Sequence, residues 1–367
     1  MKILHVIESL EVGGAEMLVV NLINDMTNDY NQAVCCIKKI GQLSNKLKKN
    51  VKIYCLNKNE GNSLIIPLQI AKIVRNYEFD VVHSHSWGHF PETFLGAKIG
   101  RSKVIVHTAH GAMEHYSKNI IKKKFRMFIE SIISIFIDKI ITVSDSLRFK
   151  IINDLFISKN KVVTIYNGVN FKVIDHKLKK NKSDLLLVTV GRLVQVKNYK
   201  MLIHAFAIAK KRCQYNVRLI FVGDGPERKN LEIECDSHNL NNNLIFYGFC
   251  DEVEKILCES DIFVNSSHYE GISLAIIEAM KFSLPVIATS VGGNNEIISD
   301  GFSGILIPDN DVEGFSDAII SLVNDKKKRF IIGKNGREKA FNKFNFEKTK
   351  RNYIILYEKL LKRNLKN

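Results

Sequence analysis

The chain has 367 residues, an apolar content of 46% and a formal net charge of +16. This length exceeds the size at which a single hydrophobic core usually stops growing, so we expect two domains. No apolar stretch is long enough to predict a membrane span. The seven cysteines form no Cys-x2-Cys pair, which favours reduced thiols in a cytoplasmic protein over disulfides or a metal cluster.

The positive charge is compatible with three kinds of partner, namely nucleic acid, an anionic membrane or an acidic ligand. No helix-turn-helix, zinc-finger or RNP-like pattern occurs in the chain, and the basic residues are not interleaved with aromatic residues on one strand. We therefore expect no nucleic acid partner.

Strand and helix signals alternate through the first half of the chain, which predicts parallel βαβ units. The first segment, Met1–Ile7, has the pattern of a strand and lacks the features of a signal peptide. A helix is expected at Ala15–Met26. The predicted strands are Lys2–Ile7, Gln32–Ile37, Val51–Cys55, Asp80–His83, Lys103–His107, Lys139–Val143 and Val162–Ile165.

A glycine pair, Gly13-Gly14, joins the first strand to the first helix. Glycines here let backbone N–H groups approach a ligand at the carboxyl end of the strand. The pair lacks the full G-x-G-x-x-G pattern, so a dinucleotide fingerprint is absent. Taken alone, the pair indicates a tight turn.

Histidines gather near two strand ends of the first half. His83, His85 and His89 alternate along one segment, but no cysteine or carboxylate completes a clear zinc ligand set, so we expect strand-end histidines that line a cleft. His110 ends another strand in Thr108-Ala109-His110-Gly111. Taken alone, it is a polar residue whose hydrogen bonds are satisfied.

A helix is predicted at Phe125–Ile141, directly after the lysine-rich segment 118–124. Its polar residues form a narrow stripe at i, i+4 spacing, which is typical of a helix buried in a core. The alternative is a basic and apolar surface that docks on an anionic membrane. The residues of the stripe are Arg126, Glu130, Ser134 and Asp138.

A polar, basic segment at 175–184 interrupts the pattern and is predicted to be an interdomain linker. We therefore expect a first domain at 1–174, a second at 185–345 and a final amphipathic helix at 346–367. The strands predicted for the second domain are Leu185–Val190, Arg218–Val222, Leu244–Tyr247, Ile262–Asn265, Pro285–Thr289 and Gly304–Ile307. Its predicted helices are Met201–Lys211, Glu227–His238, Val253–Glu259, Leu274–Met280 and Glu313–Asn324.

Two cations, Arg192 and Lys197, follow the first strand of the second domain in Gly-Arg-Leu-Val-Gln-Val-Lys-Asn. An arginine can bind phosphate oxygens through two hydrogen bonds, and a lysine adds a point charge. On charge alone, a solvated basic loop is the favoured interpretation. The turn Gly223-Asp224-Gly225-Pro226, further along, is interpreted as structural.

Two glutamates, Glu270 and Glu278, have seven residues between them and lie where a loop runs into a helix. Gly271 allows a bend, and Ser273 is a plausible N-cap. A helix start carries free N–H groups that suit a diphosphate. Glu270 would then lie at an anion site, and Glu278 would reach a neutral hydroxyl such as that of a ribose.

An Asp-x-Asp sequence, the pattern that can bind a divalent metal, occurs once, at Asp309-Asn310-Asp311. It follows a predicted strand and precedes a predicted helix, so we interpret its residues as loop and N-cap residues. We expect no metal and no cofactor.

These motifs together resemble glycosyltransferase family 4, the retaining glycosyltransferases of the GT-B fold. The resemblance rests on Glu270-x7-Glu278, the strand Pro285–Thr289, the Gly292-Gly293 turn and the Gly-Arg-Leu…Lys-Asn motif. It implies an α/β chain with two Rossmann-like domains whose parallel sheets face each other across a deep cleft. It also implies that the C-terminal helix crosses back to the first domain.

The resemblance also assigns roles to residues. It implies that Glu270, His110, Arg192 and Lys197 are catalytic. The donor site implied by the resemblance comprises Gly14, Arg192, Lys197, Gly248, Phe249, Glu270, Gly271, Ile272, Ser273, Leu274 and Glu278. Tyr247-Gly248-Phe249 would lie beside the nucleobase. Ile272-Ser273 stands where Phe-Gly is common in the family, which leaves the identity of the donor open.

The resemblance implies a metal-independent hexosyl transfer with retention of configuration, from a nucleotide sugar, with UDP favoured, to a glycan. A lipid-linked acceptor, cell-surface polysaccharide synthesis and peripheral contact with the inner face of the cytoplasmic membrane are the expected setting. Two alternatives remain. One is a GT-B isomerase similar to the nucleotide-sugar 2-epimerases, and the other is a non-catalytic subunit that binds a nucleotide sugar or a lipid.

Overall fold

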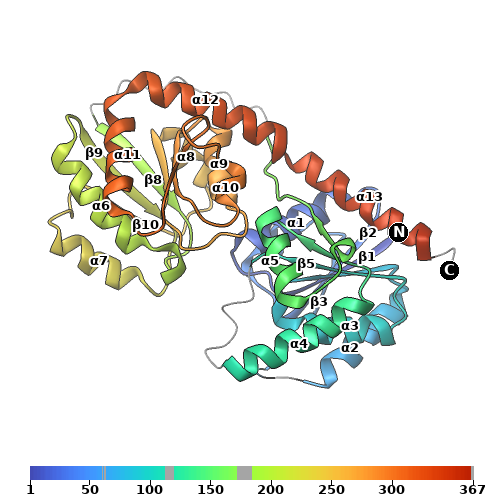
Figure 1. Cartoon of the computed structure of the whole chain (residues 1–367). Helices are drawn as coiled ribbons and strands as arrows, with labels where there is room; N and C mark the ends of the chain where they lie inside the picture. Colours follow the sequence, from blue (N-terminus) through green and yellow to red (C-terminus); the bar gives the residue numbers. More distant parts are fainter. Residues whose placement is uncertain (60, 62, 112–119, 172–183, 365–367) are drawn as a thin grey trace. The chain divides into compact units, whose positions relative to one another are not determined.

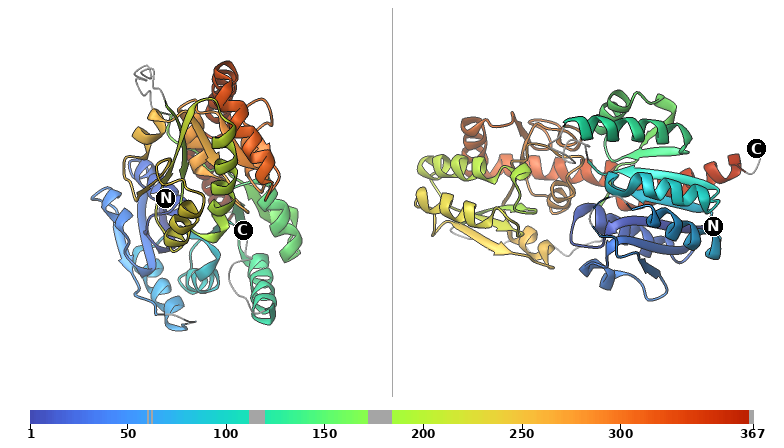
Figure 2. Two further views of the ribbon diagram at one scale, coloured as in Figure 1. Left: turned by 90° about the vertical axis from the view of Figure 1, so that its left-hand side faces the viewer. Right: turned by 90° about the horizontal axis from the view of Figure 1, so that it is seen from below.

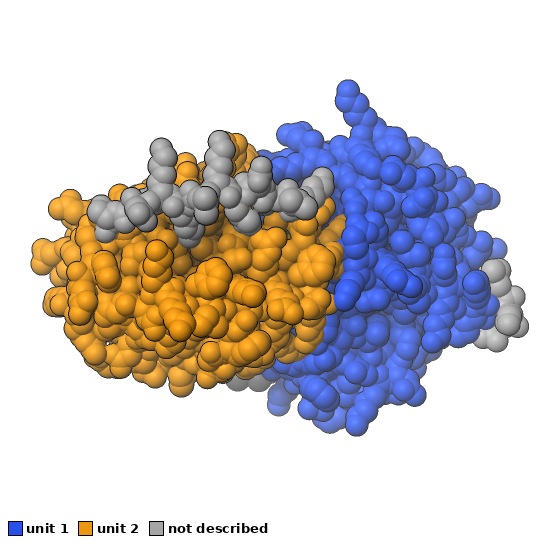
Figure 3. Space-filling model, turned by 90° about the horizontal axis from the view of Figure 1, so that it is seen from above, with its two compact units in different colours: residues 1–167, 347–367 blue, residues 168–346 orange. Residues whose placement is uncertain are grey.

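A computed structural model describes the whole chain except residues 60, 62, 112–119, 172–183 and 365–367. The chain divides into two compact units, which Figure 3 colours separately. Unit 1 comprises Met1–Asn167 and Glu347–Asn367, and unit 2 comprises Gly168–Phe346. The segment predicted to be a linker, 175–184, lies outside the described residues except for Asp184, which begins a strand of unit 2.

Unit 1 is built on a seven-stranded parallel sheet of order β3-β2-β1-β4-β5-β6-β7. The order reverses between β1 and β4, where the chain leaves one half of the sheet for the other. Its central strands are buried on both faces, as expected for a parallel sheet covered by helices. The strands are β1 (Lys2–Ser9), β2 (Asn31–Lys39), β3 (Lys52–Cys55), β4 (Val81–His85), β5 (Val104–Ala109), β6 (Lys139–Thr142) and β7 (Val162–Thr164).

Helices lie on both faces of this sheet (Figures 1 and 2), as right-handed crossovers on either side of the reversal require. They are α1 (Gly14–Met26), α2 (Ile65–Tyr77), α3 (Phe90–Ile99), α4 (Ile120–Phe136), α5 (Asp145–Leu155) and α13 (Phe346–Asn364), with short 3₁₀ turns at Gln42–Lys46, Trp87–His89 and Lys159–Lys161. The apolar face of α13 is buried in the unit at Tyr353, Tyr357 and Leu360.

Helix α4 departs from the prediction made for it. It begins at Ile120 and ends at Phe136, and Lys139 already belongs to β6, so the helix lies earlier in the sequence than the predicted Phe125–Ile141. The predicted orientation is also wrong. Glu130 and Ser134, from the polar stripe, are buried, whereas apolar residues spaced three and four apart are exposed. The prediction failed because periodicity defines two faces of a helix without saying which one meets the core.

Unit 2 contains a six-stranded parallel sheet of order β10-β9-β8-β11-β12-β13. The strands are β8 (Asp184–Val190), β9 (Asn216–Val222), β10 (Leu244–Gly248), β11 (Ile262–Asn265), β12 (Val286–Thr289) and β13 (Ile305–Ile307). The helices are α6 (Tyr199–Arg212), α7 (Arg228–Ser237), α8 (Val253–Glu259), α9 (Leu274–Lys281), α10 (Asn294–Ile297), α11 (Val312–Asn324) and α12 (Lys326–Lys343), with a 3₁₀ turn at Gln195–Lys197.

The core of unit 2 forms where α6 and α11 pack on the sheet. Phe206 and Phe315 from these helices and Phe221 from β9 are fully buried there. The strand order reverses between β8 and β11. In open α/β sheets, ligands bind at such a reversal, beyond the carboxyl ends of the strands. The two parallel Rossmann-like sheets confirm the predicted GT-B fold class.

Candidate active site

The carboxyl ends of β8 and β11 bring the predicted donor-site residues of unit 2 together. Arg192 and Lys197 follow β8, and Glu270 follows β11. Because β8 and β11 are neighbours in the sheet, the two loops meet at the same edge. Residues that are separated in sequence by more than seventy positions thus come into direct contact.

Glu270 lies in a cluster of donors. Its Oε1 atom lies 2.6 Å from Lys197 Nζ and accepts hydrogen bonds from Ser267 Oγ at 2.7 Å and Asn265 Nδ2 at 3.3 Å. The two charged side chains are 20% and 11% exposed. The sequence predicted the ions but not that they would pair, and it missed Asn265 and Ser267 altogether.

This environment keeps both partners charged. Burial alone would raise the pKa of Glu270, but the Lys197 ammonium and the hydrogen bonds from Lys197, Ser267 and Asn265 outweigh it and lower that pKa. Burial alone would lower the pKa of Lys197, but the Glu270 carboxylate raises it. The pair is therefore an ion pair at neutral pH.

Backbone contacts fix the position of the two loops. Ser266 Oγ donates to the carbonyl oxygen of Lys197, and the backbone N–H of His268 donates to that of Val196, both at 2.8 Å. On the other side of Glu270, a Cβ on Gly292 would lie 2.0 Å from the Glu270 carbonyl oxygen, and Gly292 has φ +45°. The Gly-Gly turn is therefore required for this close packing, a role that the sequence did not reveal.

The start of α9 adds N–H groups to the same loop. The predicted N-cap is confirmed, because Ser273 Oγ accepts from the N–H of Ile276. The N–H groups of the first turn, from Leu274 onward, point out of the helix start, where they suit an anion. Gly271, Ile272 and Ser273 are buried and hold the chain against the sheet.

Glu278 lies on α9 and is half-buried. Burial, together with the nearby Glu254 carboxylate, raises its pKa to about 7, although Lys281 opposes this shift. Near neutral pH its carboxyl group therefore populates both the protonated and the ionised form, whereas Glu270 is ionised. Its proposed contact with a ribose stays a prediction.

Arg192 is exposed, and no other described residue forms an ion pair with its guanidinium. Its loop is held by the turn predicted to be structural. Leu193 N–H donates to the Asp224 carbonyl oxygen at 3.0 Å, and a Cβ on Gly225 would lie 2.4 Å from the Leu193 carbonyl oxygen. The turn thus supports the loop that presents Arg192.

Tyr247-Gly248-Phe249, the segment predicted to lie beside the nucleobase, spans the end of β10. Gly248 is buried with φ +79°, and its carbonyl oxygen accepts from the N–H of Gly223 at 2.8 Å. Phe249 is 51% exposed. This strand lies at the far edge of the sheet from β11, with β9 and β8 between them.

Two of the predicted site residues belong to unit 1. Gly14 is the exposed first residue of α1, just beyond the carboxyl end of β1. His110 follows β5, and its Nε2 lies 3.3 Å from His85 Nδ1. Their roles in binding the donor sugar stay predictions.

Two metal candidates from the sequence have other roles in the structure. Asp311 caps α11 by accepting from Gly314 N–H, which confirms the N-cap interpretation. His83 and His85 are fully buried in the sheet of unit 1, so the expectation that these two residues line a cleft is wrong. The strand pattern placed them on one face but did not show how deeply that face is buried.

None of the described helices has the length and hydropathy needed to cross a lipid bilayer.

Comparisons with known proteins agree with this architecture. The model of the glycosyl transferases group 1 matches residues 170–339, and that of glycosyltransferase family 4 matches residues 12–173. An uncharacterized glycosyltransferase of Methanocaldococcus jannaschii is 31% identical over 311 residues, which cover 83% of each chain.

Two further relatives cover nearly the whole chain. The UDP-Gal:alpha-D-GlcNAc-diphosphoundecaprenol alpha-1,3-galactosyltransferase of Escherichia coli is 26% identical over 95% of this chain and 94% of its own. The crystal structure of Anabaena HepE in complex with UDP superposes with a TM-score of 0.83 at 20% identity, over 98% of this chain and all of the other. The chain therefore belongs to glycosyltransferase family 4 and is a glycosyltransferase.

Proposed function

We propose that this enzyme transfers a hexosyl group from a UDP-sugar to a lipid-linked glycan, with retention of configuration and without a metal ion. The observation that carries the proposal is the Lys197–Glu270 ion pair beside the start of α9. Unit 2 holds the donor in this proposal, and unit 1 holds the acceptor.

The charges of the site suit a diphosphate. The positive charge of Lys197 cancels the negative charge of Glu270, so the carboxylate does not repel the ligand. Arg192 adds a net positive charge, and the first turn of α9 adds N–H donors. These groups stabilise the negative charge that grows on the diphosphate as its bond to the sugar breaks, which is the work that a metal ion does in other enzymes.

The ionised Glu270 carboxylate then has a second role. As the bond between the sugar C1 and the phosphate oxygen breaks, positive charge develops at the sugar ring, and Glu270 stabilises it. The acceptor hydroxyl oxygen forms its bond to C1 on the face that the phosphate leaves, and its proton passes to the departing phosphate oxygen. The configuration at C1 is retained, and UDP is released. Glu278 holds the ribose.

The choice of acceptor rests on the Escherichia coli relative, whose name gives a diphosphoundecaprenol-linked sugar as its acceptor. A similar acceptor for this chain would place it in cell-surface polysaccharide synthesis. Such an acceptor is embedded in a membrane, which makes a membrane-facing surface an expected feature of the enzyme.

Release of nucleoside diphosphate tests the proposal. Purified enzyme is incubated with UDP-, GDP- and ADP-sugars and a diphosphoundecaprenol-linked sugar acceptor, with and without EDTA. We expect release from a UDP-sugar that EDTA does not reduce and that Glu270→Gln slows at least about 100-fold. Interconversion of the donor without an acceptor would indicate the isomerase instead, and UDP binding without turnover would indicate the binding subunit.

Helix α4 offers the membrane-facing surface. Its exposed stripe of large apolar side chains follows helical spacing and consists of Ile121, Phe125, Phe128, Ile132 and Ile135. Lys122 and Lys124 are exposed beside it. On the opposite face, Arg126 donates to the backbone carbonyl oxygen of Trp87, which holds the helix to the unit. An apolar stripe flanked by lysines complements a membrane with anionic headgroups.

Flotation with lipid vesicles tests this surface. We expect the enzyme to float with vesicles that contain phosphatidylglycerol and less with pure phosphatidylcholine vesicles. The Phe125→Ser, Phe128→Ser double variant should bind about tenfold more weakly, because two aromatic rings no longer enter the interface. Phe330→Ser, which removes a ring that is 71% exposed on α12, is the matched control and should leave binding unchanged. Equal loss in both variants would contradict the assignment.

A further inference from the structure

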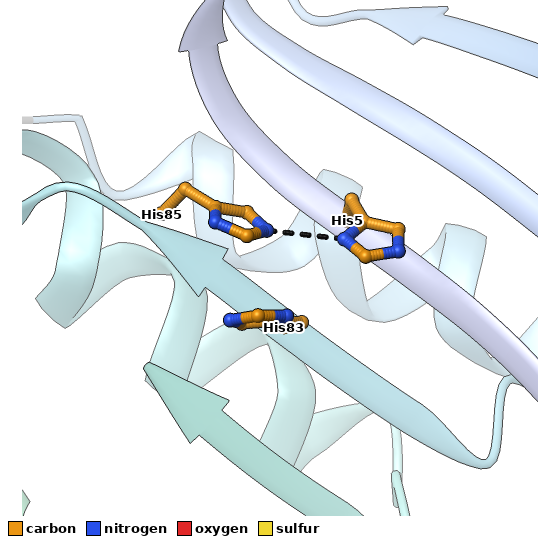
Figure 4. A group of neighbouring side chains, drawn as sticks. All are labelled: His5, His83 and His85. Carbon is orange, nitrogen blue, oxygen red and sulfur yellow. Dashed lines mark hydrogen bonds between the residues drawn. The ribbon is translucent and has the colours of Figure 1, made fainter. Parts of the chain in front are cut away.

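Five histidines of unit 1 gather on or just beyond three neighbouring strands. His5 lies on β1, His83 and His85 lie on β4, His107 lies on β5, and His110 follows it. The parallel register sets His5 directly beside His83, and Figure 4 shows how the His85 ring reaches the His5 ring. The first four are completely buried. None of the steps in the proposed reaction assigns a role to any of them.

Three of these histidines form a continuous chain of hydrogen bonds. Gln32 Oε1 lies 3.0 Å from His5 Nε2, and His5 Nδ1 lies 3.0 Å from His85 Nε2. His85 Nδ1 in turn lies 3.3 Å from His110 Nε2. These hydrogen bonds connect the amide of Gln32, on β2, to His110, which the family resemblance implies to be catalytic.

These imidazoles are neutral. Burial lowers the pKa of His5 and of His110 to about 4, and it lowers the pKa of His85 well below its ordinary value. A neutral imidazole has one nitrogen that donates and one that accepts. If one nitrogen of a ring donates, the other must accept, so the direction of each hydrogen bond determines the direction of the next one.

The donor-to-acceptor direction of these hydrogen bonds follows from the first one, between Gln32 and His5. A carbonyl oxygen can only accept, so His5 Nε2 carries the hydrogen and His5 Nδ1 accepts. His85 must then donate through Nε2 and accept through Nδ1, and His110 must donate through Nε2. His110 Nδ1 is left as a bare acceptor, and it is a buried atom without a hydrogen-bond partner among the described residues.

The neighbouring histidine lies outside this chain. His83 Nδ1 is 2.6 Å from Tyr357 Oη, and His83 Nε2 is 2.7 Å from Thr108 Oγ1. His5, His83 and His85 lie close enough together to hold a metal ion, but all of their ring nitrogens already have hydrogen-bond partners. A cation would have to break these bonds in a buried group that contains no carboxylate to balance its charge.

We infer that Gln32, His5 and His85 are positioning residues that fix His110 in the tautomer with an unprotonated Nδ1, so that this atom accepts a hydrogen bond from a hydroxyl of the transferred sugar. The inference rests on the proposed function, which supplies the sugar. A fixed acceptor favours a donor sugar with a hydroxyl at that point over a deoxy sugar, because the buried nitrogen stays unpaired without it.

The tautomers can be observed directly by NMR of the full-length enzyme with ¹⁵N-labelled histidine. Long-range proton–nitrogen correlations distinguish a protonated ring nitrogen from a bare one. We expect His5, His85 and His110 all to carry hydrogen on Nε2. The opposite tautomer at His110, which would follow from a Gln32 amide turned by 180°, would overturn the inference. This measurement needs no sugar donor, so its outcome is independent of the proposed function.

A pair of variants tests the effect on activity. Gln32→Met keeps the size of the side chain and removes the first acceptor, so His110 should populate both tautomers. With the two tautomers about equally populated, kcat should fall about twofold while the Kd for UDP is unchanged. Tyr357→Phe is the matched control, because it removes a buried hydrogen bond of the same cluster outside the chain. It should leave the His110 tautomer and kcat unchanged. Equal losses of kcat in the two variants would show a merely structural role.

Discussion

The two units place very different chemistry at the carboxyl ends of similar sheets. In unit 2, Lys197 and Glu270 are oppositely charged, and each keeps the other ionised. In unit 1, His5, His85 and His110 are kept neutral by burial and joined only by hydrogen bonds. The two units differ because the buried ions of unit 2 each have an opposite charge beside them and the buried histidines of unit 1 do not. A buried group stays ionised only beside an opposite charge. In our account, the charged groups of unit 2 bind the diphosphate, and the neutral histidines of unit 1 position a hydrogen-bond acceptor for the sugar.

The largest effect is expected from removing the negative charge in unit 2. Glu270→Gln keeps the shape of the side chain, so kcat should fall about 100- to 1,000-fold as charge stabilisation at the sugar is lost. UDP binding should not weaken, because Lys197 no longer has a countercharge. Steady-state kinetics and calorimetry measure both quantities. Asp236→Asn, which neutralises an exposed carboxylate on α7 of the same unit, is the control and should change neither. An unaltered kcat in Glu270→Gln would contradict the assigned role.

Acidification should affect the two units differently. The pKa of folded His5, about 4, lies below its ordinary value of 6.5, so the unfolded chain binds more protons between these values. Stability is therefore lost as the pH falls from about 6.5 to 4, by roughly 3 kcal/mol for His5 alone. The Glu270 pKa is below 4.5, so the ion pair persists to lower pH.

The single tryptophan provides a reporter for this comparison. Trp87 is 1% exposed in unit 1, so its fluorescence follows that unit alone. We expect its acid transition to precede the loss of helical circular dichroism from unit 2. Coincident transitions at low pH would show that the histidines are not held neutral.

Most of the fold was predictable because its strands are continuous apolar runs, the pattern of a buried parallel sheet. The contacts of the site were less accessible. The Lys197–Glu270 pair depends on β8 and β11 being neighbours, and the histidine chain depends on the register that sets His5 beside His83. Both are properties of strand pairing, which a local pattern does not encode. The family resemblance supplied the roles of Arg192 and His110, which composition and spacing alone left open.

A smaller effect on activity is expected from removing one of the hydrogen bonds that Glu270 accepts. Ser267→Ala removes the 2.7 Å donor to Glu270 but leaves Lys197 and Asn265 in place. We expect kcat/KM to fall about threefold to tenfold, less than the usual cost of losing a hydrogen bond to a charged group, because the two remaining partners still hold the carboxylate. Ser299→Ala, in a loop of the same unit, is the comparison in the same assay. A loss as large as that of Glu270→Gln would mean that Ser267 itself contacts the substrate.

The smallest effect concerns Glu278, whose carboxyl group forms no ion pair with any described residue. Its folded pKa, about 7, lies above the ordinary 4.5, so its contribution to stability decreases as the pH rises between these values. Glu278→Gln should therefore raise the Tm at about pH 8 by roughly 2–4 °C and change it less at about pH 5. Thermal unfolding without nucleotide measures this. A lower Tm at the higher pH would show that the carboxylate is stabilised in the folded state.

The central claim is that protein cations, and not a metal ion, hold the diphosphate. Calorimetric titration of UDP into the enzyme and into Arg192→Ala, each with and without EDTA, tests it most directly. Our account predicts that EDTA has no effect and that the variant binds UDP about 10- to 100-fold more weakly, because a bidentate charged contact is lost. Binding that EDTA abolishes, or that Arg192→Ala leaves unchanged, would contradict the account.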